Sequence, residues 1–291
     1  MNKSYYIETY GCQMNVADSE IVDGILEREG YKQTQNIKDA NAIFINTCAV
    51  RDHAEAKVHS RLGYFNKIKK DHPEVIIGML GCMAQNLKDE ILENKPYVDI
   101  VLGPDSYRKL PVILNNRLRE QNHIVDTKLS RFEVYDGLFP SRKEGINAWV
   151  SIMRGCDKFC TFCIVPFTRG RERSRSPKSI IKEVEQAIKN GFVEITLLGQ
   201  NVNSYKSNNV DFTDLLRKIA DIPGLLRLRY TSPHPSDVNE KLLEVMAESK
   251  NICKSIHFPL QAGSDRILKR MNRTYSKSHF LTYTKKIRDI I

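Results

Sequence analysis

Three segments in the first third of the chain have the composition of buried strands, and each is followed directly by a cysteine. Tyr5–Tyr10 leads to Cys12, Ala42–Asn46 to Cys48, and Val75–Leu80 to Cys82. Two segments with helical apolar spacing, Ser19–Arg28 and Ala54–Lys70, separate them. This alternation predicts a parallel sheet with helices on its faces. Since ligand sites of such sheets form at the carboxyl ends of strands, we expect Cys12, Cys48 and Cys82 to meet at one edge.

A second alternating series begins at Asn147. Strands are expected at Ala148–Met153, Val193–Leu198, Leu225–Tyr230 and Ser255–Phe258, and helices at Pro177–Lys189, Phe212–Ala220, Pro235–Glu248 and Lys277–Asp289. Four such units in a row predict part of a TIM-like (β/α) barrel. The fold class is therefore α/β, with an open parallel sheet domain at residues 1–125, a connector at 126–146 and a barrel-type core at 147–291.

Composition narrows the class of protein. No stretch approaches the roughly 20 apolar residues of a membrane helix, and the first residues lack the apolar core of a signal peptide. We therefore expect a cytoplasmic protein without membrane contact. In that reducing compartment, the seven cysteines are better explained by metal ligation than by disulfides. The net charge of +10 favours an anionic partner, with nucleic acid as the first candidate.

Cys156, Cys160 and Cys163 form a Cys-x3-Cys-x2-Cys loop directly after the first strand of the second series. Three thiolates on a tight loop can ligate three irons of a [4Fe–4S] cube, whereas most such clusters use four cysteines. With no fourth cysteine nearby, one iron stays open to an amine and a carboxylate, as S-adenosylmethionine (SAM) offers. The alternative is a structural zinc loop, but zinc usually has four ligands in paired knuckles.

Other candidate residues surround this loop. Seven basic residues against two acidic ones lie between residues 154 and 178, and among them Arg169, Arg171, Arg173 and Arg175 are predicted to contact RNA phosphates. A second basic stretch, residues 265–291, is an alternative RNA surface. Gln200 and Asn201 follow the second strand of this series and are predicted to contact SAM by position. No catalytic residue beyond the cluster ligands is predicted.

The segment from Arg154 to Arg175, RGCDKFCTFCIVPFTRGRERSR, resembles the signature of the radical SAM methylthiotransferases. The resemblance covers the whole chain. Tyr10–Asn15, Asn46–Arg51 and Gly81–Gln85 are similar to three further motifs of that family. The resemblance implies that Cys12, Cys48 and Cys82 hold a second, auxiliary [4Fe–4S] cluster. It also implies that Phe162, the aromatic residue before the last loop cysteine, packs near the SAM adenine.

Branches of this family differ in substrate. Cys12-Gln13-Met14-Asn15 and the Arg154-Gly155 pair are similar to the branch that adds a methylthio group to C2 of N6-isopentenyladenosine beside the tRNA anticodon. The alternatives are the same chemistry on threonylcarbamoyladenosine in tRNA or on a ribosomal protein, and a non-catalytic iron–sulfur or zinc protein that binds RNA. The implied partners are tRNA, an electron donor and a sulfur source of unknown identity, and we expect a monomer.

The radical SAM cores that this chain resembles usually have six strand–helix units, and the family normally carries a small C-terminal β-barrel that helps to hold tRNA. Only four units are visible after Asn147, and nothing here resembles the β-barrel. We therefore expect an incomplete core that exposes a strand edge, with weak tRNA affinity and poor solubility.

Overall fold

The computed structural model describes residues 3–49, 52–120 and 122–291, and the chain divides into two compact units. The first unit comprises residues 1–131, 138–142 and 167–169, and the second comprises 132–137, 143–166 and 170–291. Val50 and Arg51, at the end of one of the motifs, lie outside the described residues. The expected domain boundaries stay a prediction, although the expected connector contributes segments to both units.

The first unit is built on a six-stranded parallel sheet with the order β2-β1-β3-β4-β5-β6. Its strands are β1 (Ser4–Tyr10), β2 (Lys32–Gln33), β3 (Ala42–Thr47), β4 (Ile76–Gly81), β5 (Ile100–Leu102) and β6 (Ile124–Asp126). Its helices are α1 (Gln13–Arg28), α2 (Asp52–Asp71), α3 (Cys82–Leu87), α4 (Glu90–Asn94) and α5 (Leu110–Glu120), with 3-10 turns η1 (Ile37–Asp39) and η2 (Pro104–Lys109). The predicted open parallel sheet is confirmed.

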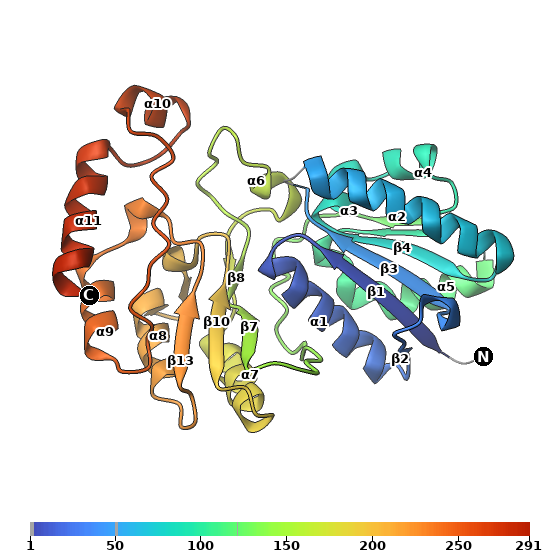
Figure 1. The fold of residues 1–291 in the computed structure, drawn as a ribbon, viewed down its shortest axis with the longest axis horizontal. Coiled ribbons are helices and arrows are strands. Elements are labelled where there is room, and N and C mark those ends of the chain that lie inside the picture. Colours follow the sequence, from blue (N-terminus) through green and yellow to red (C-terminus); the bar gives the residue numbers. More distant parts are fainter. Residues whose placement is uncertain (1–2, 50–51, 121) are drawn as a thin grey trace. The chain divides into compact units, whose positions relative to one another are not determined.

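Helices cover both faces of this sheet, with α1 and α2 on opposite sides (Figure 1). Every residue of β3 and β4 is buried, as expected for central parallel strands that are apolar throughout. Val58, Leu62 and Phe65 of α2 pack with Ile43 and Ile45 of β3 in one apolar cluster. The sheet is therefore a rigid support for the loops at its edge.

The second unit contains a three-stranded parallel sheet with the order β13-β10-β7. Its strands are β7 (Asn147–Ser151), β10 (Glu194–Leu198) and β13 (Arg227–Tyr230), beside the small antiparallel pairs β8 (Met153–Arg154) with β9 (Arg173–Ser174) and β11 (Lys206–Ser207) with β12 (Val210–Asp211). Its helices are α7 (Pro177–Lys189), α8 (Phe212–Ala220), α9 (Glu240–Glu248), α10 (Asp265–Arg270) and α11 (Lys277–Ile290), with 3-10 turns η3 (Val202–Ser204) and η4 (Pro235–Asp237). The short helix α6 (Val165–Thr168) contains residues of both units.

Helix α7 begins at Pro177 as predicted, because the Ser176 hydroxyl accepts the Ser179 N–H and proline at the first helical position needs no amide partner. Helix α8 likewise begins at Phe212, where Asp211 and Asp214 form a reciprocal capping box. The predicted helix 235–248 is interrupted, because Asn239 caps a new start of α9 through the Leu242 N–H.

The predicted fourth strand, Ser255–Phe258, was wrong. After α9 the chain forms a single isolated bridge to β13, between Ile252 and Leu228. Residues 255–258 form no strand. The reason lies in Lys254, whose ammonium group donates to the carbonyls of Met246, Ala247 and Ser249 and so caps the end of α9. Within the described part of the chain, no helix is long and apolar enough to cross a membrane.

Candidate metal centres

The three cysteines of the first unit lie at one edge of its sheet. Tyr10 of β1 is paired with Thr47 of β3, and Thr47 is paired in turn with Gly81 of β4. Cys48 and Cys82 directly follow the last two residues of this row, and Cys12 follows one residue later. The register therefore places Cys12, Cys48 and Cys82, called the N-terminal cysteine site below, where three adjacent parallel strands end.

Two glycines let the strand ends approach each other at this site. Gly11 has φ +135°, and a Cβ there would lie 2.7 Å from the Cys48 Cβ. Gly81 has φ +93°, and a Cβ there would overlap the Asn46 side-chain oxygen and lie 2.8 Å from the Thr47 carbonyl oxygen. At both positions the backbone conformation favours glycine, and the neighbouring atoms leave no room for a Cβ atom. The site is thus a cradle that a Cβ atom would fill.

Buried polar side chains hold the cradle together. The Asn15 Oδ1 accepts the Cys12 N–H at 3.3 Å, and the Asn15 Nδ2 donates to the Asn46 Oδ1 at 3.2 Å. Asn46 donates in return to the Asn15 carbonyl oxygen and to the Ser19 hydroxyl. Since Asn15 and Asn46 are fully buried, these bonds fix the first turn of α1 against the end of β3.

The thiols of this site interact electrostatically. A hydrogen bond from the Cys48 thiol lowers the pKa of Cys12 to about 6, and the positive charge of Arg169 acts in the same direction. Burial raises the pKa of Cys82, while Arg169 opposes that rise. The Arg169 Nε lies 3.2 Å from the Cys82 Sγ. The site therefore contains a cation that favours thiolate ligands.

In the second unit, Cys156, Cys160 and Cys163, called the loop cysteine site below, lie between β8 and α6. Gly155 begins the loop at φ +75°, where a Cβ would overlap the carbonyl oxygens of Gly170 and Arg171. The Gly155 N–H donates to the Gln200 Oε1 at 2.6 Å, and the Cys156 N–H donates to the Gly170 carbonyl oxygen at 3.2 Å. The start of the loop is therefore fixed by backbone packing rather than by its side chains.

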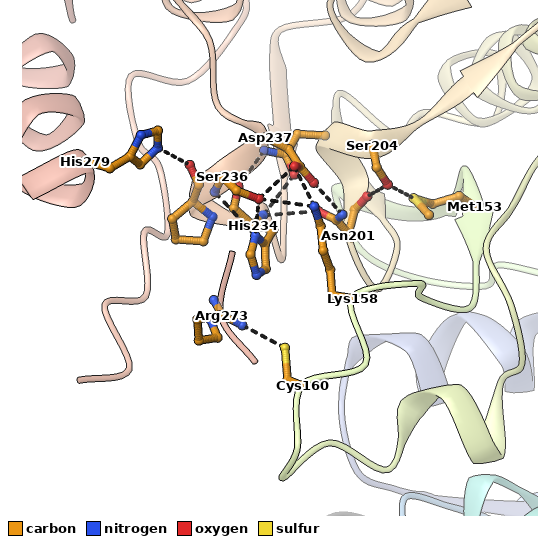
Figure 2. Close-up of polar contacts among 12 residues, drawn as sticks. Met153, Lys158, Cys160, Asn201, Ser204, His234, Ser236, Asp237, Arg273 and His279 are labelled. Carbon is orange, nitrogen blue, oxygen red and sulfur yellow. Dashed lines mark hydrogen bonds and ion pairs between the residues drawn. The ribbon is translucent and has the colours of Figure 1, made fainter. Parts of the chain in front are cut away.

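A segment distant in sequence holds the other half of this loop. Asn272 donates from Nδ2 to the carbonyl oxygens of Lys158 and Phe159, both at 3.0 Å. Arg273 donates from Nη1 to the Cys160 Sγ at 3.2 Å, and Figure 2 shows its side chain directed at that cysteine. The Thr161 N–H reaches the Met271 carbonyl oxygen. Residues 271–273 therefore clamp the loop and bring a cation to one of its thiols.

Beside the loop lies a polar network centred on Asp237. Lys158 donates to the Asp237 Oδ1 at 2.6 Å, and Asn201 donates to its Oδ2 at 2.8 Å (Figure 2). The Asn201 Oδ1 accepts the His234 N–H. Burial, with the nearby cations Arg273 and Lys158, lowers the pKa of His234 to about 4, so its ring is neutral at pH 7.

The residues predicted to contact SAM have differing environments. Gln200 and Asn201 both use side-chain oxygens within the protein, on Gly155 and His234 respectively. Phe162 is 54% exposed on the loop. A role for these three residues in SAM binding stays a prediction.

Both cysteine sites fit an iron–sulfur cluster in donor chemistry and in shape. Each combines three thiols with a glycine cradle and an arginine donor to one sulfur. Burial raises the pKa of Cys156 to about 11, and the charges of Glu172, Cys163 and Cys160 add to that rise, so the thiolate there needs a bound cation such as iron to be stable. Among the described residues, no three His, Cys, Asp or Glu side chains are placed to bind a single metal ion. A cubic cluster has no need of such a set, because each thiolate binds a different iron.

The four arginines predicted to contact RNA are not equivalent. Arg171 is the exposed member, with 71% of its side chain accessible, and it pairs with Asp157 at 2.8 Å. Arg175 is buried against Glu183 and the Ser151 carbonyl oxygen, and Arg173 is buried on β9. Arg169 is buried in the first unit. In this structure the three buried side chains are not placed to meet a phosphate, so RNA contact is retained as a proposal for Arg171.

Several residues of these sites were not predicted from the sequence. Asp18 and Asn15 lie on the buried face of α1, and a charged residue on such a face requires a partner. The sequence therefore indicated that Asp18 has a partner, but it did not indicate which residue that partner is. Asn272 and Arg273 gave no signal of their own, since they read as part of a basic stretch.

Known families and proteins match both halves of the chain. Residues 4–103 match the "Uncharacterized protein family UPF0004", and residues 150–291 match the "Radical SAM superfamily". Proteins of Amoebophilus asiaticus and Bacteroides fragilis named tRNA-2-methylthio-N(6)-dimethylallyladenosine synthase are each 46% identical over 100% of this chain. A Thermoanaerobacter protein of the same name is 45% identical. The chain spans 63% to 65% of the length of these relatives.

Among solved structures, the radical S-adenosylmethionine methyltransferase TsrM from Kitasatospora setae, with cobalamin and a [4Fe-4S] cluster bound, matches with a TM-score of 0.70. The match covers 100% of this chain and 68% of that one at 15% identity, so it supports the fold alone. The family models and the sequence relatives confirm the resemblance to the radical SAM methylthiotransferase family that was first seen in the cysteine motifs.

Proposed function

We propose that this chain is the catalytic part of a tRNA methylthiotransferase that adds a methylthio group to C2 of N6-isopentenyladenosine, also called dimethylallyladenosine. The observation that carries the proposal is the presence of two separate three-cysteine sites in one chain, each with its own glycine cradle. The name of the relatives that are 45–46% identical over the whole chain supports the substrate.

In this proposal the loop cysteine site holds a [4Fe–4S] cluster that binds SAM, and the N-terminal cysteine site holds an auxiliary [4Fe–4S] cluster. When bound, these groups supply one-electron chemistry on SAM and a place for sulfur. The chain itself orients them. Asn272 and Gly155 fix the loop backbone, and Arg273 donates to a loop thiol. No general acid or base is assigned, because removal of a hydrogen atom needs none.

The test of this function is the tRNA of cells that lack the gene. Mass spectrometry of their nucleosides should show N6-isopentenyladenosine without its 2-methylthio derivative, and reintroduction of the gene should restore the derivative. Loss of a methylthio group from threonylcarbamoyladenosine instead, or from a ribosomal protein, would contradict the proposed substrate. Unchanged methylthiolation of all three would favour a non-catalytic RNA-binding protein.

We propose tRNA as the partner, and Arg171 as one of its phosphate contacts. Arg171 is exposed, and its guanidinium lies 5.1 Å from the centre of the Phe159 ring on the cysteine loop. Cations beside aromatic rings suit single-stranded RNA, since they combine phosphate attraction with base stacking.

Replacing Arg171 with glutamine should therefore reduce the slope of log affinity for tRNA against log salt by about one unit. Arg217→Gln is a matched control, because Arg217 is also an exposed arginine, with 57% of its side chain accessible, in the last turn of α8. Its slope should be unchanged. Fluorescence anisotropy with labelled tRNA over a range of salt concentrations measures both slopes. Equal slopes for the two variants would place the phosphate contacts elsewhere, with residues 265–291 as the next candidate.

A further inference from the structure

We propose that Arg169 is a positioning residue for the N-terminal cysteine site. Its guanidinium, held in place by Asp18, hydrogen-bonds the Cys82 sulfur and raises the reduction potential of the cluster at that site. This inference rests on the proposed function, because it requires an auxiliary cluster on Cys12, Cys48 and Cys82.

The geometry places one side chain between two anionic groups. The Arg169 Nε donates to the Cys82 Sγ at 3.2 Å, and its Nη2 donates to the Asp18 Oδ2 at 2.7 Å. Only 3% of the Arg169 side chain and 1% of the Asp18 side chain are accessible. All three residues belong to the first unit. The planar guanidinium therefore has a fixed orientation, with Nη2 on the carboxylate and Nε on the sulfur.

Burial of this ion pair needs a reason beyond stability. Removing both charges from water carries a desolvation cost that their attraction often does not exceed, so a buried ion pair is often no more stabilising than apolar residues of the same volume. An arginine paired with one aspartate would be neutral by itself. Here the same cation also donates to the Cys82 Sγ, at the edge of the sheet where the three cysteines of the site lie. The buried pair is thus explained by the hydrogen bond that Arg169 makes to a ligand sulfur.

The sign of the effect on a bound cluster follows from charge. Reduction adds one electron and makes the cluster more negative, so a positive donor on a ligand sulfur stabilises the reduced form more than the oxidised form. Hydrogen bonds to the sulfurs and net charge are among the factors that set cluster potentials. Loss of Arg169 should therefore make the auxiliary cluster harder to reduce. Loss of Asp18 should act less strongly, through a guanidinium that is less well fixed.

The experiment uses the full chain with Cys156, Cys160 and Cys163 replaced by alanine, so that the remaining iron reports on the N-terminal cysteine site alone. Arg169→Gln, Arg169→Lys and Asp18→Asn are introduced into this background. Arg117→Gln is the matched control, because Arg117 forms a buried ion pair with Asp99 in the same unit, beside the start of β5 rather than at the cysteine edge. The readouts are iron and sulfide content and the midpoint potential, from electron paramagnetic resonance of dithionite-poised samples.

We expect about four irons per chain in the background protein and in the Arg117→Gln variant, at the same potential. The Arg169→Gln variant should have a more negative potential than the background protein. The potential of the Arg169→Lys variant should lie between these two, because lysine keeps the positive charge but cannot contact the sulfur and the carboxylate through separate nitrogens. If the Arg169→Gln variant fails to load iron, the test is the midpoint potential of the Arg169→Lys variant, which should be more negative than that of the background protein. If neither loads, while circular dichroism shows a folded chain and Arg117→Gln loads, a positioning role is also supported.

An unchanged potential in a loaded Arg169→Gln variant would overturn the inference and leave Arg169 as a structural ion-pair partner. A background protein without iron or sulfide would instead contradict the auxiliary cluster itself. The two failures are therefore distinguishable.

Discussion

Replacing Cys156, Cys160 and Cys163 together with alanine is expected to halve the iron of the reconstituted chain, from about eight to about four per molecule, and to abolish reductive cleavage of SAM. The reason is that these three thiols are the only cysteines on the loop that Gly155 and Asn272 hold in place. Without them SAM has no open iron to bind. Iron analysis and chromatographic detection of 5′-deoxyadenosine after addition of dithionite measure the two effects.

The matched variant replaces Cys12, Cys48 and Cys82 in the same way. It should also lose about half of the iron but keep some SAM cleavage, because the loop cysteine site is intact. Cys253→Ala should change neither quantity, since Cys253 lies in neither site. Continued formation of 5′-deoxyadenosine by the loop triple variant would show that SAM is cleaved somewhere else.

Gly81→Ala is expected to remove the cluster from the N-terminal cysteine site while leaving the loop cysteine site loaded. Gly81 has φ +93° and ψ −159°, a conformation open almost only to glycine, whose strain costs an alanine about 1–3 kcal/mol. The added Cβ would also collide with the Asn46 side chain and the Thr47 carbonyl oxygen. Either the strand end or the cradle must shift. We expect about four irons per chain and retained SAM cleavage.

Gly30→Ala is the control for this prediction. Gly30 also has a positive φ, +80°, but nothing lies within 4 Å of the Cβ that alanine would add. It therefore shares the left-handed backbone without the collision, and it should keep about eight irons. Full iron in the Gly81→Ala variant would show that the cradle tolerates a side chain and does not shape the site.

Strand positions in the first unit could be predicted because parallel strands buried on both faces are continuous apolar runs. The predicted strand Ala42–Asn46 ends one residue before the observed β3 does. The predicted strand Val75–Leu80 begins and ends one residue before the observed β4. The meeting of Cys12, Cys48 and Cys82 at one edge followed from the same pattern, because residues after adjacent parallel strands share an edge.

Helix α1 shows what a local pattern misses. The apolar spacing placed its start at Ser19, but the helix begins at Gln13. Polar residues interrupt the apolar spacing before Ser19, because Asn15 and Asp18 contact the cysteine edge instead of an apolar core. A helix end that serves a site lacks the periodicity from which helices are recognised.

The arginines after the loop show the limit of reading charge from sequence. A cluster of basic residues usually indicates a solvated face or a phosphate site. Here Arg169 is buried and paired with Asp18, which is distant in sequence. Arg175 is buried and paired with Glu183, which no sequence motif singles out. The partners of a buried charge are set by tertiary packing. The clamp by Asn272 and Arg273 was missed for the same reason, since it joins segments more than a hundred residues apart.

The most direct test of two clusters in this protein is the metal content of the unsubstituted chain after anaerobic reconstitution. We predict about eight irons and about eight acid-labile sulfides per chain, divided between the loop cysteine site and the N-terminal cysteine site. Zinc in stoichiometric amount without sulfide, in protein purified without oxygen, would contradict it.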